Sequence, residues 1–479
     1  MMRQHNRSDL FVKPLWVLFV FSSMSFSGLV ARSSFADESV TITESWASPI
    51  LVGGAIGVPA LAAHPDGTVI GVYYLSGFPD STLVLVQISA DGSIEEIGTV
   101  SEPTDSSAAA VDVLDDGTIV VASDADGVVV VRGWNVAGTE LFETVIPGTS
   151  VNQAFPPLLQ GRGQTIYVAA AAGGDSLVAR LDAGGNVAWS ETFDGPSGSE
   201  DSPTSIAACG LGVAVGGMSN DGVMVLKYDG SGTLEWDEVF SGSLGAFLPL
   251  GKTYVDCDAA GQVAVAANPE SLCGVQEVVL RLYDSVGDQA WTKTIPSNPC
   301  EQMSPVGVTF SIDGRVVFGG HGIDDHPFFD RYHARSYGQD GTEVWSRSFD
   351  AVGSIDVAYG FAVDSLGNVY MTGATTLGAQ SRDIVTVGWT ASGERCFDAQ
   401  WSGPGANNDI PSVLLVQPGG RVTVAGQQSE IGEGSDIIFL RYQAPSTPIP
   451  TMSFWGLAIL LLTMVMFAAV LHTREDAST

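Results

Sequence analysis

Short runs of alternating apolar and polar residues recur along the chain, and glycine-containing turns separate them. Runs such as Thr118–Ala122, Gln262–Ala266 and Arg315–Gly319 are rich in valine and other residues that favour strands. Between the two termini we find no long segment with apolar residues at helical spacing. The pattern therefore predicts an all-β interior.

The turns return at intervals of about 50 residues. After each turn come a β-rich run, a loop, a further strand such as Val223–Tyr228, and a closing Gly-x-x-x-aromatic segment such as Gly232 to Trp236. Glycine supplies the positive φ of a tight hairpin, and the aromatic residue packs where one unit meets the next. The eight turns are Asp66-Gly67, Asp116-Gly117, Gly163-Gln164, Gly210 to Gly212, Ala260-Gly261, Asp313-Gly314, Leu366-Gly367 and Gly419-Gly420.

One four-stranded meander per unit at this period is typical of a β-propeller blade. The predicted fold is therefore an all-β propeller of eight four-stranded blades, or of seven if the weak first or fourth unit is a loop. The eighth unit lacks a Gly-x-x-x-aromatic strand after Tyr442. We expect Ser39–Trp46 to supply the missing strand and close the ring, which buries an otherwise open edge.

The units resemble the SBBP-type propeller repeats of secreted bacterial proteins, which read roughly D-x-x-G-N-x-Y-x-T-G, a loop, an Asp-containing strand and G-x-x-x-W. The best copies are Asp364–Gly373 and Asp182–Trp189. The likeness covers nearly the whole region between the termini. Because these motifs are structural, the resemblance implies a fold and no catalytic residue.

The termini predict export and a membrane anchor. Residues 1–36 combine basic residues, an apolar run and a small-x-small ending at Ala36, which is typical of a cleaved signal peptide. An ectodomain of residues 37–444 follows, then a Pro/Ser/Thr linker at 445–454. Residues 455–472 are apolar and long enough for a transmembrane helix, and 473–479 form a short tail. The alternative at the N-terminus is a retained membrane helix.

The linker and helix resemble the IPTL-CTERM sorting signal of Gram-negative bacteria, whose pattern is I-P-T-L-x-x-W-G. This resemblance implies recognition by an exosortase-like processing enzyme and transfer to a surface anchor. Met452 replaces the usual leucine, and the tail is less basic than is usual in the family. A plain, uncut membrane anchor is the alternative. The matching residues are Ile449, Pro450, Thr451, Met452, Trp455 and Gly456.

The chain is strongly acidic, with 20 Lys and Arg against 54 Asp and Glu and a formal net charge of −34. Such a charge repels phosphates, so nucleic acid and anionic membrane surfaces are not expected partners. It confers solubility, and a cation-dependent surface is the alternative. We expect no cofactor, with Ca²⁺ as the one candidate.

One loop gathers histidine and carboxylate side chains. His321, Asp324, Asp325 and His326 could together hold Zn²⁺ or another transition metal, although their spacing matches no named site. A polar loop tip is the competing interpretation. The loop belongs to a set of long loops on one propeller face, where we expect any ligand to bind. The set comprises Asn268–Gln276, His321–Asp330, Thr375–Arg382 and Gln427–Ser435.

Two Asp-rich turns, Asp124–Gly127 and Asn220–Gly222, offer oxygen ligands for Ca²⁺. Neither is a complete twelve-residue calcium loop with a terminal glutamate. Ordinary turn chemistry explains both turns equally well.

All five cysteines fall in the exported region, where disulfides persist. Cys273 and Cys300 are expected in loops on one face of a single blade and are the first candidate pair. Cys209 and Cys257 occupy matching positions in adjacent units and form the second. Cys396 remains, beside the blade aromatic Phe397, where we expect it to be buried rather than reactive.

These features favour a non-catalytic surface protein that binds a glycan, a matrix component or another protein. The rival class is a propeller enzyme. A quinone-dependent dehydrogenase is disfavoured because the chain lacks an adjacent Cys-Cys pair. A carbohydrate-active enzyme needs paired carboxylates, which cannot be picked out from so many acidic residues.

Overall fold

The computed structural model describes residues 46–54, 59–75, 80–103, 109–125, 127–149, 156–196, 198, 200–240, 252–268, 277–295, 303–322, 330–351, 356–376, 382–403, 408–430 and 434–443. All of them belong to one compact unit, Ser39–Thr479. The signal peptide, sorting motif and C-terminal helix predicted from the sequence lie outside these residues. Within them, no helix is long and apolar enough to cross a membrane.

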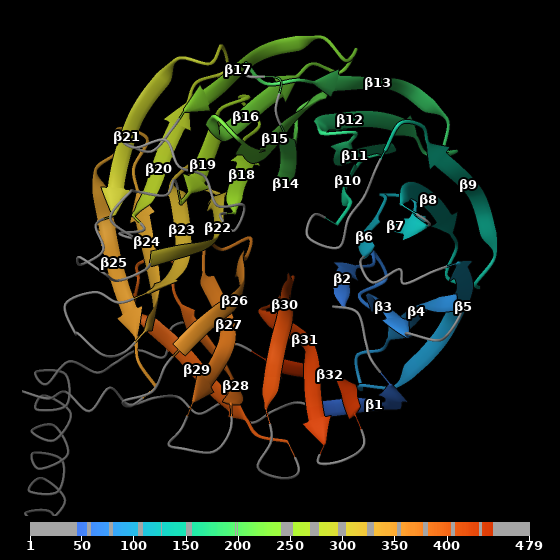
Figure 1. Ribbon diagram of the computed structural model, residues 1–479. Helices are drawn as coiled ribbons and strands as arrows, with labels where there is room; N and C mark the ends of the chain where they lie inside the picture. Colours follow the sequence, from blue (N-terminus) through green and yellow to red (C-terminus); the bar gives the residue numbers. More distant parts are fainter. Residues whose placement is uncertain are drawn as a thin grey trace, which may run out of the picture. The chain divides into compact units, whose positions relative to one another are not determined.

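The described residues form eight four-stranded antiparallel sheets, which follow one another around a propeller ring (Figure 1). The prediction of an all-β propeller with eight blades is confirmed. Each blade runs from an inner first strand to an outer fourth strand. Blades 1 to 4 consist of β2 (Ala60–Ala63), β3 (Val69–Leu75), β4 (Asp80–Ile88) and β5 (Ile94–Pro103); β6 (Ala109–Val113), β7 (Ile119–Ala125), β8 (Val128–Trp134) and β9 (Glu140–Ile146); β10 (Leu158–Arg162), β11 (Thr165–Ala172), β12 (Asp175–Asp182) and β13 (Val187–Phe193); and β14 (Asp201–Cys209), β15 (Gly212–Ser219), β16 (Gly222–Tyr228) and β17 (Leu234–Phe240).

The second half of the ring repeats the same order, and its last blade takes its outer strand from the other end of the chain. Blades 5 to 8 consist of β18 (Thr253–Cys257), β19 (Val263–Ala267), β20 (Val278–Tyr283) and β21 (Gln289–Ile295); β22 (Met303–Phe310), β23 (Val316–Gly322), β24 (Arg331–Tyr337) and β25 (Glu343–Phe349); β26 (Asp356–Val363), β27 (Val369–Thr376), β28 (Arg382–Trp389) and β29 (Arg395–Trp401); and β30 (Asp409–Gln417), β31 (Arg421–Glu430), β32 (Gly434–Gln443) and β1 (Trp46–Gly54).

An N-terminal strand closes the ring, but it lies further along the chain than expected. β1 begins at Trp46 and runs to Gly54, so it shares only Trp46 with the expected strand. Trp46 pairs with Arg441 of β32, as Trp236 pairs with Lys227 in blade 4. The expectation was misplaced because the blade aromatic stands near the start of an outer strand, not at its end. Residues 39–45 lie outside the described part.

In blades 2 to 6 the aromatic residue of the outer strand packs against the next blade, as the sequence predicted. The indole ring of Trp189 in blade 3 lies against the hairpin turn of blade 4, where its Nε1 donates to Gly230 O at 3.1 Å. A Cβ added to Gly232 would approach Trp189 to 2.8 Å. The same contact joins Trp236 to Gly287, so glycine is required by the neighbouring ring as well as by the turn.

Aliphatic side chains fill the spaces between adjacent sheets. Between blades 2 and 3, for example, Val120 and Val131 pack with Ile166 and Val168 in one buried cluster. A similar cluster joins blade 8 to blade 1, which completes the core around the ring.

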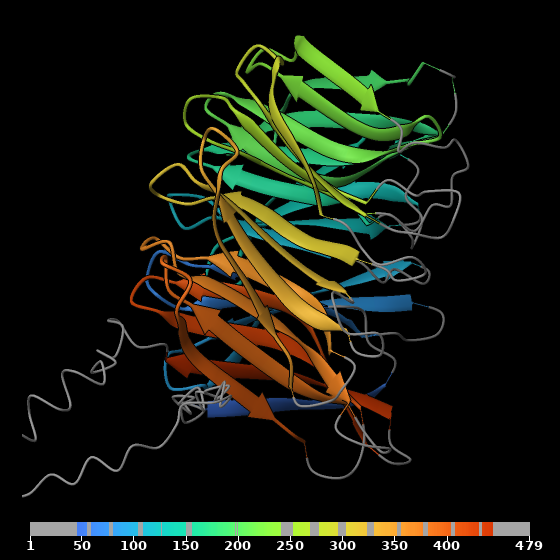
Figure 2. The same ribbon diagram turned by 90° about the vertical axis from the view of Figure 1, so that its left-hand side faces the viewer.

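The antiparallel meander gives the ring two different faces. The hairpins between first and second strands and between third and fourth strands lie on one side, which we call the turn face. The described turns of blades 4 to 7 appear along the left-hand side of Figure 2. The other side, the loop face, is where second strands end and where each outer strand leads to the next blade. The loop expected at Gln427–Ser435 is shorter than predicted, because β31 extends to Glu430 and β32 starts at Gly434.

Candidate functional site

His321 does not stand at a loop tip. It lies in β23, one residue before the end of that strand on the loop face. Burial, and next the nearby His333, lower the pKa of His321 to about 4, so its imidazole is neutral at pH 7. Its Nδ1 has no hydrogen-bond partner among the residues that the structure describes, whereas His333 Nε2 lies 3.1 Å from Gly322 O.

The rest of the predicted metal cluster cannot be placed beside His321. Asp324, Asp325 and His326 lie outside the described residues. Within the described ranges, no group of three or more His, Cys, Asp or Glu side chains is arranged to hold a metal. The zinc site therefore remains a prediction from the sequence.

The two candidate calcium turns show hydrogen bonds typical of turns. Asp124 lies in β7, and its Oδ1 accepts a hydrogen bond from Gly127 N at 2.9 Å. Asp221 N donates to Ser219 Oγ at 3.2 Å. Asp126 lies outside the described residues. Both arrangements are those of polar side chains that stabilise a reversal of the chain.

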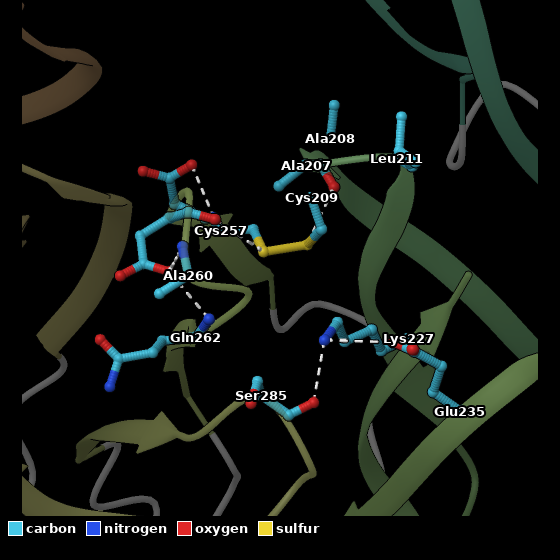
Figure 3. Close-up of a disulfide and its surroundings, with 12 residues drawn as sticks. Ala207, Ala208, Cys209, Leu211, Lys227, Glu235, Cys257, Ala260, Gln262 and Ser285 are labelled. Carbon is cyan, nitrogen blue, oxygen red and sulfur yellow. Dashed lines mark hydrogen bonds and ion pairs between the residues drawn. A yellow bond between two sulfur atoms is a disulfide. The ribbon is translucent and has the colours of Figure 1, made fainter. Parts of the chain in front are cut away.

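Cys209 and Cys257, the second candidate pair, form a disulfide with a Cα–Cα distance of 5.2 Å (Figure 3). Each cysteine is the last residue of an inner strand, β14 or β18, at the turn face. The bond therefore joins the inner edges of blades 4 and 5 covalently. Cys273 and Cys300 lie outside the described residues.

Cys396 is the free cysteine among the described residues. It is a half-buried residue of β29 at a register shift, directly before the fully buried Phe397. Burial, as the main cause, raises the pKa of the Cys396 thiol to about 12. The thiol is therefore protonated at neutral pH and a poor nucleophile.

The inner strands of neighbouring blades are also bonded side to side around the axis. Asp112 of blade 2 accepts from Gly161 N at 2.8 Å, and Gln160 of blade 3 accepts from Ala208 N at 2.8 Å. Further round, Asp256 of blade 5 accepts from Phe310 N at 2.8 Å. With the disulfide, these bonds join the inner strands of blades 2 to 6 one to the next.

Three carboxylates fix the connections between blades on the loop face. Asp201, Asp356 and Asp409 are the first residues of β14, β26 and β30, and all three are almost fully buried. Each accepts a hydrogen bond from the backbone of the segment that has just left the preceding outer strand. The donors are Gly195 N to Asp201, Ala351 N to Asp356 at 2.8 Å and Gly403 N to Asp409 at 2.7 Å. We call these three residues the loop-capping carboxylates.

Two of the connections have a glycine that the carboxylate requires. A Cβ added to Gly195 would approach Asp201 Oδ1 to 2.8 Å, and one added to Gly403 would approach Asp409 Oδ1 to 3.0 Å. In both, proline follows the glycine, the aspartate stands six residues after the glycine, and another proline follows two residues later. This recurring Gly-Pro, Asp, Pro spacing was the signal in the sequence that could have identified the caps.

Burial makes two of the capping carboxylates, Asp201 and Asp409, hard to ionise. The pKa of Asp409 is raised to about 6, mainly by burial and to a smaller extent by repulsion from nearby Asp383. Burial likewise raises the pKa of Asp201, with a smaller contribution from Asp194. Backbone donors oppose the shift in both cases because they favour the charged form.

In blade 2 a carboxylate reaches the corresponding place from the preceding blade. Glu102 of β5 is fully buried and accepts from Tyr74 Oη at 2.7 Å and Ser123 Oγ at 2.8 Å. Arg132 of β8 forms an ion pair with it. Ser123 matches Ser219 of blade 4, since each pairs with the first residue of its inner strand. Buried carboxylates therefore stabilise the loop face at four of the eight junctions between the described blades.

The fold and these contacts define the chain as an eight-bladed β-propeller. A family model described as "Beta-propeller repeat" (SBBP) matches residues 344–376, which include the repeat copy at Asp364–Gly373. The resemblance of the repeats to this family is confirmed over that stretch. No curated protein matches the chain.

Several solved structures are similar to the chain. An ulvan lyase of a polysaccharide lyase family is 9% identical, with a TM-score of 0.48 over 83% of this chain and 96% of that one. The WD40 domain of SCAP from fission yeast is 10% identical, with a TM-score of 0.45 over 83% and 98%. A prolyl endopeptidase is 13% identical, with a TM-score of 0.45 over 81% of this chain and 54% of that one.

Proposed function

We propose that the chain is an exported, non-catalytic β-propeller, anchored in the bacterial envelope, that binds an extracellular glycan, matrix component or protein through its loop face. The loop-capping carboxylates carry this proposal. These buried carboxylates accept hydrogen bonds from the backbone of the segments that connect the blades. Burying a carboxylate costs desolvation free energy, and the strands would form without it. Binding residues commonly stand on loops that a rigid frame holds in place.

The proposal is tested by applying the purified exported protein to an array of glycans and matrix proteins. Binding should be lost, with the melting transition still cooperative, when Asp201 and Asp409 are both replaced by alanine, because the blade connections then lose their caps. Asp182→Ala is the matched control, since Asp182 is an exposed turn residue on the other face. Equal loss of binding in the control would contradict a site on the loop face.

The same preparation separates binding from catalysis. We expect no turnover of alcohols with quinone and Ca²⁺, and none of polysaccharide substrates. Turnover that survives purification to homogeneity would contradict the non-catalytic proposal, whatever the array shows.

The proposed anchor is tested by the intact mass of the surface form. If Ile449–Met452 is a processed sorting signal, the chain should end near Thr451. A mature chain that still ends at Thr479 would mean that the C-terminus is a simple membrane anchor.

A further inference from the structure

The four most exposed large aliphatic side chains among the described residues lie on the turn face of four consecutive blades. Leu211 of blade 4 is 84% exposed, Val286 of blade 5 is 70%, Ile312 of blade 6 is 77% and Leu366 of blade 7 is 60%. We call these four residues the aliphatic turn tips. Single exposed aliphatic residues are ordinary on protein surfaces, but these four occur together on one side of the ring.

The turns do not need aliphatic side chains at these places. Asp284 caps its turn through hydrogen bonds from Val286 N at 3.0 Å and Asp288 N at 2.9 Å, which use only the backbone of Val286. Likewise Asp364 accepts from Leu366 N at 2.8 Å. The conformation of these two turns therefore comes from aspartate and glycine, and a polar residue at the tip would serve as well.

Contacts between blades link the neighbourhoods of the turns that carry these tips. Lys227 of blade 4 donates to Ser285 O at 3.0 Å, directly beside Val286 (Figure 3). Blade 5 reaches the strand that precedes Ile312 through the bond from Phe310 N to Asp256. A Cβ on Gly367, next to Leu366, would lie 3.9 Å from Ser311 Cβ, next to Ile312.

The turns that carry the tips contain more carboxylates than cations. Hydrogen bonds from Ser231 lower the pKa of Asp229, and those from Thr342 lower the pKa of Asp340, so both carboxylates stay ionised well into acid. Cations oppose part of this charge: Arg315 lies 2.7 Å from Asp313, and Lys293 lies near Asp340. Three further cations donate to backbone carbonyls of these turns, namely Lys227, Arg180 and Arg347. The carboxylates in the described turns of these four blades are Asp229, Asp258, Asp284, Asp288, Asp313, Asp340, Asp364 and Glu394.

We propose that the aliphatic turn tips form a docking surface for a protein that presents apolar side chains ringed by lysine and arginine. Apolar contact supplies binding energy, and the carboxylates select the cationic rim and speed association. A second copy of this chain is disfavoured, because it would bring the same acidic turns face to face. The surface lies opposite the loop face, so this proposal is independent of the ligand proposed there.

The probe is a short synthetic peptide of alternating leucine and lysine, titrated into the purified exported protein. We expect saturable binding that weakens as salt rises. Replacing Leu211, Val286, Ile312 and Leu366 together by serine should weaken it at least about tenfold. The matched control replaces Leu141, Val145 and Val344 by serine. These residues lie on outer strands and are exposed by 51%, 52% and 52%.

Three results would overturn the docking surface. One is equal binding by the wild type and the variant lacking the aliphatic turn tips. Another is evidence of non-specific adhesion. Either an equal loss of binding in the outer-strand control or equal binding of a leucine–glutamate peptide would give that evidence. The third is a wild-type dimer in sedimentation that the serine variant abolishes, because a second copy would then be the occupant. Protection of the turns of blades 4 to 7 from hydrogen exchange by the bound peptide is the supporting result.

Discussion

Individual glycines and aspartates in this propeller are fixed by what lies against them. Gly232 shows both constraints of the closing segment, since its φ is +90° and Trp189 of the preceding blade occupies the place of a side chain. Asp409 is subject to two opposing effects: the hydrogen bond from Gly403 N favours its charged form, and burial, which is the larger effect, raises its pKa. Each residue supports a separate prediction.

Gly232→Ala should destabilise the protein by about 2 to 3 kcal/mol, because a left-handed backbone strain and a collision with Trp189 act together. Gly210→Ala is the control. Its φ is also positive, at +57°, but nothing lies within 4 Å of the place of its Cβ. Chemical unfolding of both variants should show the smaller loss in Gly210→Ala. Equal losses would mean that contact with the neighbouring aromatic contributes nothing.

Asp409→Asn should stabilise the protein at pH 8 by about 1 kcal/mol and leave it unchanged at about pH 4. The folded pKa of about 6 lies above the ordinary value of 3.8, so the folded state binds this proton more tightly. The tighter proton binding stabilises the folded state at low pH, and this stabilisation is lost as the pH rises through about 6. Asparagine keeps an oxygen for Gly403 N without the charge. Melts across this pH range measure the difference, and a constant difference would contradict the buried-charge explanation.

At the scale of strands and blades, the sequence predicted most of the fold. The period of the turns, the valine-rich runs and the Gly-x-x-x-aromatic segments are repeated local signals, so eight blades followed from them. β1 was misplaced because it occurs once and only Trp46 marks its register. The loop-capping carboxylates were missed because the Gly-Pro, Asp, Pro spacing around Asp201 and Asp409 occurs only twice. The spacing alone does not show that folding brings Gly195 and Gly403 beside these carboxylates.

Replacing both Cys209 and Cys257 by serine should cost about 4 kcal/mol, which is the loop-closure term for a separation of 48 residues. The bond is the covalent link between two inner strands, so its loss should loosen blades 4 and 5 relative to each other. Guanidinium unfolding with and without reductant measures the effect. Reductant should destabilise the wild type and Cys396→Ser alike, and both by more than the double variant, which retains only the predicted Cys273–Cys300 pair. An equal response of all three proteins would contradict this role.

At the scale of the whole molecule, ring closure depends on the pairing of two strands from opposite ends of the chain. β1 pairs with β32, and Arg441 of β32 also reaches across to Ser89 O of blade 1 at 3.4 Å. Without β1, β32 would become an open edge next to a gap in the ring, and open edges promote aggregation.

Deletion of residues 46–54 should therefore turn a monomer into aggregates on size exclusion. A synthetic peptide with the sequence of residues 46–54 should restore the monomer, and a scrambled peptide should not. Monomeric behaviour of the deletion variant without any peptide would show that the ring closes in another way.

The position of β32 also decides how the propeller responds to force. In its sheet, β32 lies between β31 and β1 and pairs with both along most of its length. Tension applied to the chain after Gln443 would pull along this strand, so two rows of backbone hydrogen bonds would be loaded in shear and would have to fail together. A protein tethered at that end would therefore resist a pulling force until both rows of hydrogen bonds failed, and the N-terminal strand would carry part of the load.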